Sequence, residues 1–179
     1  MPELPEVETV RAGLEHGIIN KTIARVVLHR ADLRLPFPAG FAQHLEGSTI
    51  TSVRRRAKYL LIHLSGGVVW LAHLGMSGRF SLLRAAPDMF KRHEHVAVIF
   101  TDGAALIYND PRRFGVMDVV AADAISTHKL LAHLGFEPLA KDFPTAAFAA
   151  KLKARGTSIK QALMDASLVV GVGNIYASE

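Results

Sequence analysis

The first residues of the chain carry a candidate nucleophile. Pro2 follows the initiator methionine, and a small second residue favours removal of Met1, which would expose the secondary amine of Pro2. An α-amino group titrates near pH 8, so part of it is neutral at pH 7 and able to attack an aldehyde or a sugar C1′. A secondary amine forms a cationic iminium, which acts as an electron sink.

Carboxylates follow this amine at short intervals, namely Glu3, Glu6 and Glu8. Pro5 suits the first turn of a helix, where negative charge is also favoured by the helix dipole. Apolar residues recur at helical spacing as far as Ile18 and predict that this helix has a buried face. The spacing alone also fits an ordinary N-terminal helix with an acidic first turn.

The densest basic cluster is Arg54-Arg55-Arg56-Ala57-Lys58. Strand alternation predicts that Arg54, Arg56 and Lys58 share one face. Three cations on one face repel one another unless they meet anions such as phosphates. The alternative is a solvated edge strand, in which charged residues discourage pairing with another chain.

Two glycine-bracketed turns carry side chains suited to insertion into a duplex. In His73-Leu-Gly-Met-Ser-Gly78, Met76 lies at the tip of the turn, and the alternative is a methionine that fills a gap beneath the loop. In Asn109-Asp-Pro-Arg-Arg-Phe-Gly115, Arg112 could bond an orphaned base and Phe114 could wedge a base step. The alternative there is a β-turn with solvated arginines and an inward Phe114.

Two further segments have weaker chemical signals. His93, Glu94 and His95 could suggest a metal, but two histidines at i, i+2 without a third ligand favour surface polar residues. Ser158 is a plausible helix N-cap, and the glycine-rich segment 171–174 predicts the start of a helix, which can bind an anion.

Short β-branched segments predict the scaffold that positions these residues. Hairpin turns at Ser65-Gly66-Gly67 and Thr101-Asp102-Gly103 favour an antiparallel β-sandwich. The predicted strands are Thr22–His29, Ser48–Arg56, Tyr59–Leu64, Val68–Leu74, Arg79–Leu83, His95–Phe100, Ala104–Asn109 and Gly115–Ala121.

The composition changes after Ala122, where helical periodicity replaces strands. Together with the N-terminal helix, the pattern predicts an α+β fold with domains at 1–135 and 136–179, divided at the break Gly135-Phe-Glu-Pro138. The predicted helices after the first are Pro38–Glu46, Ala124–Leu134, Thr145–Ala154 and Ser158–Asp165.

Composition narrows the class of protein and partner. A net charge of +5 favours nucleic acid over a membrane as the partner. We find no signal peptide and no apolar run long enough to span a bilayer. The chain has no cysteine, which excludes disulfides and cysteine-based zinc sites within it and fits a cytoplasmic protein.

The N-terminal string Met-Pro-Glu-Leu-Pro-Glu-Val-Glu-Thr-Val resembles the signature of the formamidopyrimidine-DNA glycosylase family. The turns around Met76 and Arg112, the segment Arg56-Ala-Lys-Tyr-Leu-Leu and the stretch 168–177 match the same family. The resemblance implies an N-terminal β-sandwich followed by a helix-two-turns-helix region. It also implies base-excision repair of oxidised purines, 8-oxoguanine and formamidopyrimidines, by a monomer acting on double-stranded DNA with oxidised bases or abasic sites.

The resemblance assigns roles residue by residue. Pro2 is the nucleophile that attacks C1′, Glu3 is the general acid, Glu6 is a support and Lys58 binds phosphate and assists the chemistry. The DNA contacts that it implies are Met76, His93, Arg112, Phe114, Lys160 and Asn174. Cleavage of the glycosidic bond is followed by β- and δ-elimination, and the residues present require no cofactor.

The family continues beyond Glu179 with further helices and a zinc finger that binds one zinc ion through four cysteines. We therefore expect a truncated or partial sequence that keeps the nucleophile but binds DNA poorly. The alternatives are an endonuclease VIII-like glycosylase for oxidised pyrimidines and a catalytically silent DNA-binding module. The Leu4-Pro5-Glu6-Val7 sequence favours the purine enzyme by resemblance.

Overall fold

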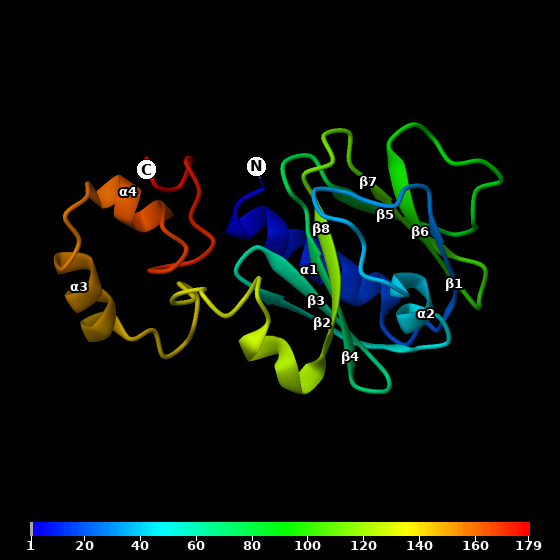
Figure 1. Cartoon of the computed structure of the whole chain (residues 1–179), viewed down its shortest axis with the longest axis horizontal. Coiled ribbons are helices and arrows are strands. Elements are labelled where there is room, and N and C mark those ends of the chain that lie inside the picture. Colours follow the sequence, from blue (N-terminus) through cyan, green and yellow to red (C-terminus); the bar gives the residue numbers. More distant parts are fainter. Residues whose placement is uncertain (1) are drawn as a thin grey trace.

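A computed structural model describes residues 2–179 of the chain. Eight strands form two antiparallel four-stranded sheets, in the orders β1-β6-β7-β5 and β2-β3-β4-β8. Figure 1 shows the sandwich on one side and the helices α3 and α4 standing apart from it on the other. The strands are β1 (Ile23–Leu28), β2 (Ile50–Arg56), β3 (Tyr59–Leu64), β4 (Val68–His73), β5 (Arg79–Leu83), β6 (Glu94–Phe100), β7 (Ala105–Asn109) and β8 (Val116–Ala121).

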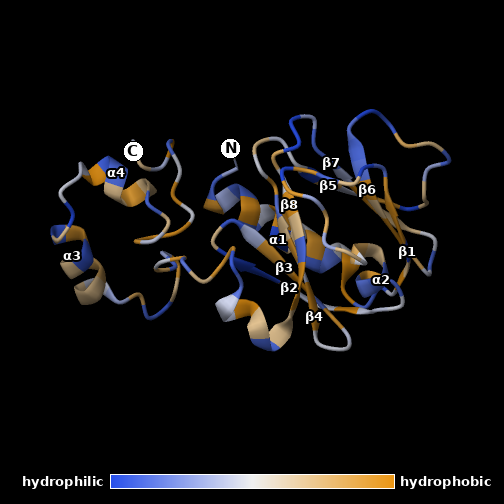
Figure 2. Cartoon of the chain, viewed as in Figure 1, coloured by the Kyte–Doolittle hydropathy of each residue, from blue (hydrophilic) through white to orange (hydrophobic). Residues whose placement is uncertain are grey.

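Alternating apolar residues from both sheets meet in one core. Trp70 and Tyr108 are fully buried there, and Phe41 from the short helix α2 (Phe41–Leu45) packs edge-on against Trp70. Figure 2 shows the hydrophobic colouring along β1, β4 and β6. This arrangement confirms the predicted β-sandwich, because apolar faces of two sheets exclude water only when they stack.

The N-terminal helix α1 (Leu4–Ile18) packs against β2, an edge strand. Its buried residues are Leu4, Val7, Leu14 and Ile18, the face that helical spacing predicts. The helix therefore covers the β2 edge of its sheet, and its first turn points toward the C-terminal region.

The C-terminal region contains α3 (Thr145–Lys153) and α4 (Ile159–Met164). Ser158 is the N-cap of α4 and accepts a hydrogen bond from the Gln161 N–H at 3.3 Å, as its residue type predicts. This region is the helical part of the predicted fold, and Figure 1 shows its last segment, in red, running back toward the start of α1.

The helix predicted at Ala124–Leu134 is wrong. The chain forms a 3₁₀ helix, η1 (Ala122–Thr127), followed by turns. His128 lies 3.3 Å from Asp118, and Leu131 is buried against the outer face of the sheet. These contacts bend the chain along the sheet, so tertiary packing overrides the helical pattern. No helix among residues 2–179 is long and apolar enough to cross a membrane.

Candidate active site and nucleic-acid interface

The carboxylate of Glu3 is enclosed by the C-terminal region of the chain. It accepts backbone hydrogen bonds from Gly173 at 2.9 Å, Ile175 at 2.8 Å and Tyr176 at 3.2 Å. The Leu4 N–H also donates to the Gly171 carbonyl at 3.0 Å. Residues separated by about 170 positions in the sequence thus form one site at the start of α1.

Glycine is required for this close approach. A Cβ atom at Gly173 would lie 2.5 Å from Glu3 Cδ, which no real side chain tolerates. Gly171 has a φ of +83°, and a Cβ there would lie 2.4 Å from Leu4 Cδ1. The helix predicted to start at Gly171 is accordingly replaced by turns over residues 174–178.

The carboxylate of Glu3 is buried, with 3% of the residue exposed. Burial alone would raise the pKa of its carboxyl, but three backbone N–H donors and the positive charge of Lys58 lower the pKa below its ordinary value. A lowered pKa favours the ionised form, which is the form that can accept the proton released by an attacking amine. Glu3 therefore fits proton transfer next to an attacking amine.

The remaining residues of the N-terminal prediction lie beside Glu3. Glu6 accepts a hydrogen bond from the Glu3 N–H at 3.0 Å, which fixes the first turn of α1. Pro2 precedes this turn and is partly exposed. The removal of Met1 lies outside the described residues. The structure thus brings Pro2, Glu3 and Glu6 together at one helix end.

Lys58 lies in the tight turn between β2 and β3 and faces the same acids. Burial lowers the pKa of its ammonium group, whereas the charges of Glu3 and Glu6 raise it. The net pKa is below the ordinary value of 10.5. Lys58 is therefore a half-buried cation placed within electrostatic reach of the carboxylate of Glu3.

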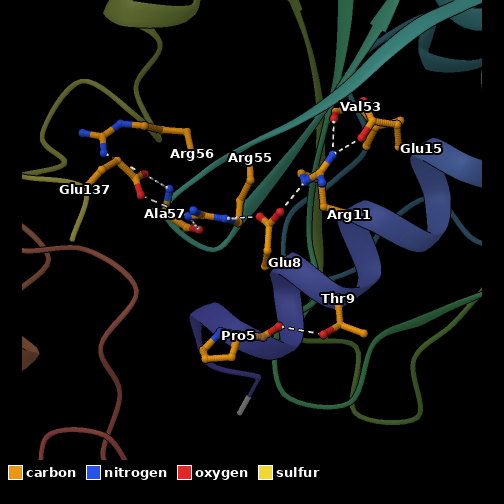
Figure 3. Close-up of polar contacts among 10 residues, drawn as sticks. All are labelled: Pro5, Glu8, Thr9, Arg11, Glu15, Val53, Arg55, Arg56, Ala57 and Glu137. Atoms are coloured by element: carbon orange, nitrogen blue, oxygen red, sulfur yellow. Dashed lines mark hydrogen bonds and ion pairs between the residues drawn. The ribbon is translucent and has the colours of Figure 1, made fainter. Parts of the chain in front are cut away.

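Glu137, from the segment after the sandwich, holds this turn in place (Figure 3). Its carboxylate accepts hydrogen bonds from the Ala57 N–H and from the guanidinium groups of Arg55 and Arg56, the latter two at 3.0 Å. Arg55 also bonds Glu8 of α1 at 2.8 Å. Ala57 has a φ of +53°, a conformation that costs an L-residue about 1 kcal/mol.

The predicted face of Arg54, Arg56 and Lys58 is wrong. Strand β2 ends at Arg56, so Lys58 belongs to the turn and does not continue the alternation. Arg56 also donates to the carbonyls of Leu134 and Gly135, at 2.8 and 2.7 Å. The guanidinium of Arg56 therefore binds the segment that leads into the C-terminal region. Of the three cations, only Arg54 is exposed on the edge strand, as the alternative predicted.

A pocket of about 300 Å³ opens beside the two predicted insertion loops. Arg34, His73, Gly75, Met76 and Phe114 line it. Burial, with the nearby charges of Lys58 and Arg34, lowers the pKa of His73 to about 4, so the ring is neutral at pH 7. Sequence reasoning missed His73 and Arg34 as pocket residues, because neither is marked by a pattern of its own.

The three predicted insertion side chains point outward. Met76 is 38% exposed and Phe114 is 41% exposed, so neither fills a gap in the interior as the alternatives required. The guanidinium of Arg112 lies 4.9 Å from the centre of the Phe114 ring. The loops thus present one sulfur-containing, one cationic and one aromatic side chain to the same surface.

His93 and His95 differ in their surroundings. His93 has a φ of +71° and is partly exposed, whereas His95 is buried and bonds the Asp110 carbonyl at 2.8 Å. Within residues 2–179, no group of three histidine, cysteine or acidic residues lies close enough to hold a metal. The absence of cysteine also leaves no ligands here for a four-cysteine zinc finger.

Lys160 and Asn174 are brought together at the far end of the same region. Lys160 Nζ donates to Ser178 Oγ at 2.8 Å, and Ser178 Oγ donates to the Asn174 carbonyl at 2.7 Å. Both predicted phosphate contacts are exposed. Ser178 therefore links the ammonium group of Lys160 to the backbone of Asn174, and both residue types are ones that contact phosphates in nucleic-acid complexes.

Family models match both parts of the chain. The formamidopyrimidine-DNA glycosylase N-terminal domain matches residues 1–117, and the H2TH domain of the same protein matches residues 134–179. The chain belongs to the formamidopyrimidine-DNA glycosylase family. The two matched domains are the two parts of the chain that meet at Glu3.

Curated members of the family are similar along the whole chain. A formamidopyrimidine-DNA glycosylase of Cereibacter sphaeroides is 50% identical over 186 residues, and one of Ruegeria pomeroyi is 47% identical. Each match covers 100% of this chain and 66% of the relative. The chain therefore spans slightly under two thirds of the length of these relatives.

Solved structures of the family share the fold. The Lactococcus lactis enzyme in complex with DNA that contains an abasic site superposes with a TM-score of 0.90 at 33% identity, covering 99% of this chain and 65% of that one. The same enzyme bound to DNA with an N7-benzyl-Fapy-dG lesion gives a TM-score of 0.90 at 34% identity.

Proposed function

We propose that this chain excises oxidised purines from double-stranded DNA and then cuts the strand at the resulting abasic site. The observation that carries the proposal is the enclosure of the Glu3 carboxylate, next to Pro2, by backbone N–H groups of the C-terminal region. Burying a carboxylate costs free energy unless specific donors replace the water that it loses. A carboxylate that is buried and held in this way beside a candidate amine nucleophile is therefore a candidate for a functional role.

The chemistry follows from the order of groups at this site. The Pro2 amine attacks C1′, the glycosidic bond breaks with its electron pair going to the base, and the departing base takes a proton from water. Opening of the sugar ring gives an iminium, and Glu3 takes the proton released by the amine and supplies it to the ring oxygen. Loss of a C2′ proton expels the 3′ phosphate, a second elimination expels the 5′ phosphate, and water then frees Pro2.

The other residues bind and orient the substrate. Lys58 neutralises a phosphate beside the reacting sugar. Met76 fills the space left by the flipped nucleotide, Arg112 bonds the orphaned base and Phe114 wedges a base step. Together these contacts offset the few kcal/mol that flipping costs. His93, Lys160 and Asn174 contact backbone phosphates. No step requires a cofactor, and the zinc finger of longer family members lies outside these residues.

Borohydride reduction tests the proposal directly, because it converts the iminium into a stable protein–DNA bond. Duplexes with 8-oxoguanine opposite cytosine and with an abasic site are incubated with the chain, whose N-terminal mass is measured in parallel. Crosslinking of both duplexes supports the proposal. Crosslinking of neither, with Pro2 at the N-terminus, refutes it and leaves a silent DNA-binding module.

A second substrate class deserves a parallel duplex. The Lactococcus lactis enzyme has been crystallised with DNA that contains an oxidised pyrimidine. We therefore include a duplex with an oxidised pyrimidine, and faster crosslinking there than with 8-oxoguanine would favour the endonuclease VIII-like alternative.

For the chain of 179 residues we also propose weak DNA binding, because its relatives have further residues beyond the matched 66%. A binding curve at physiological salt with an affinity equal to that of a full-length relative would refute this second proposal. Salt matters here because phosphate contacts lose affinity steeply as it rises.

A further inference from the structure

The two insertion loops run side by side because of the strand order. Residues 74–78 connect β4 to β5, and residues 110–115 connect β7 to β8, so both loops cross from one sheet to the other. His73 pairs with Val116 before the crossing and Arg79 pairs with Asn109 after it. The sheets therefore force the loops to cross at the same place in opposite directions.

A single buried carboxylate lies between the loops. Asp110 is 0% exposed, and its oxygens accept hydrogen bonds from Ser77 Oγ at 2.5 Å, the Gly115 N–H at 2.8 Å and the Tyr108 hydroxyl at 3.2 Å. Ser77 belongs to the Met76 loop, whereas Gly115 ends the other loop. Hydrogen bonds to a buried charge are among the stronger ones in proteins.

Ser77 extends this link to Arg112. Its hydroxyl donates to Asp110 and accepts a hydrogen bond from the Arg112 N–H at 3.1 Å. The backbones also touch, since a Cβ at Gly75 would lie 2.3 Å from the carbonyl carbon of Phe114. Each loop is therefore held by the other, directly next to the residues that it presents.

We propose that Asp110 is a positioning residue that joins the two loops into one preformed insertion unit. This rests on the proposed function, in which Met76, Arg112 and Phe114 enter the duplex together. Loops that moved independently would each have to be ordered on binding, whereas a joined pair is already ordered. Asp110 acts through the loops and touches no reacting atom.

The test substitutes a residue in one loop and measures the hydrogen exchange of a backbone N–H in the other loop. Ser77→Ala removes the hydroxyl between the loops but leaves the Gly115 N–H its own acceptor, Asp110. Asp110→Asn leaves the Gly78 N–H its own acceptor, the Leu74 carbonyl at 2.8 Å. Ser81→Ala, at an exposed position of β5, is the control. Residue-specific hydrogen exchange is measured for all variants.

We expect Gly115 to exchange about tenfold faster in Ser77→Ala and Gly78 to exchange about tenfold faster in Asp110→Asn, the scale of one lost hydrogen bond to a charge. Ser81→Ala should change neither rate. Faster exchange confined to the mutated loop would overturn the proposal. Ser77→Ala keeps this test informative even if Asp110→Asn does not fold, because the Ser77 side chain is only partly buried.

Crosslinking then connects the unit to activity. Ser77→Ala should reduce borohydride crosslinking to the 8-oxoguanine duplex about tenfold and leave crosslinking to a single-stranded abasic oligonucleotide unchanged, since that substrate needs no flipping. An equal loss on both substrates would indicate a general structural effect and refute the role in insertion. If the unmodified chain crosslinks to neither, the proposed function fails, while hydrogen exchange still decides whether the loops are joined.

Discussion

Removal of the Glu137 carboxylate should loosen the turn that carries Lys58. Glu137→Ala deletes the acceptor of three hydrogen bonds, from Ala57, Arg55 and Arg56. The side chains of Glu137 and Arg55 are only 23% and 11% exposed. Breaking such a largely buried pair from one side costs about 3–5 kcal/mol when the remaining charge has no partner.

The structure places the expected loss at the lower end of that range. Arg55 keeps the carboxylate of Glu8 and the Ala57 carbonyl, and Arg56 keeps two backbone carbonyls. We therefore expect the free energy of unfolding to fall by about 3 kcal/mol. Urea denaturation measures it, and Asp142→Ala, at an exposed site, is a control expected to stay within about 0.5 kcal/mol.

A second substitution distinguishes the strain of the β2–β3 turn from the loss of the Glu137 contacts. Ala57→Gly removes the cost of the positive φ, so in the Glu137→Ala background it should restore about 1 kcal/mol of the free energy of unfolding. A loss below about 1 kcal/mol in Glu137→Ala would refute the reasoning on the junction. A double variant no better than Glu137→Ala would refute the reasoning on the strained turn.

Three further predictions concern the same site. His73 has a pKa of about 4 in the folded chain against 6.5 ordinarily. The neutral ring therefore contributes stability that is fully present above pH 6.5 and is lost as the pH falls to 4, about 3 kcal/mol in all. Urea unfolding of His73→Asn should show a flatter dependence of stability on pH, and a dependence equal to that of the wild type would contradict this assignment. Gly173→Ala should push against Glu3 Cδ, lower stability by about 1–3 kcal/mol and slow crosslinking, and wild-type values for both would exclude the close contact. The crosslinkable fraction of any preparation should equal the fraction that has lost Met1, as measured by intact mass; crosslinking of protein that retains Met1 would rule out the Pro2 amine.

The sandwich could be predicted from the sequence because its signals are local. Two-residue alternation marks the strands, the turns Ser65-Gly66-Gly67 and Thr101-Asp102-Gly103 mark the β3–β4 and β6–β7 hairpins, and the observed strands lie within about two residues of the predicted ones. The helix predicted over 124–134 failed because contacts of His128 with Asp118 and of Leu131 with the sheet bend the chain, and a local periodicity does not report such tertiary contacts.

The candidate site was only partly predictable. The N-terminal signature places Pro2, Glu3 and Glu6 at the start of α1 because short motifs fix their own spacing, whereas the catalytic and DNA-binding roles assigned to the site residues stay predictions. Contacts across long distances were not predicted, above all Glu137 on the Lys58 turn and Gly173 on Glu3. Nothing in a single sequence pairs a glutamate with an arginine 82 residues away, so such partners become visible only once the fold is known.

The enclosure of Glu3 sets an order of events during synthesis. Its donors lie at Gly173, Ile175 and Tyr176, so the acid site is assembled only when nearly all of these residues have left the ribosome. At about 5–20 residues per second, the N-terminus is exposed for roughly 10–30 s before this closure. The N-terminus is therefore accessible early in synthesis, while the nascent chain still lacks the backbone donors that enclose the Glu3 carboxylate.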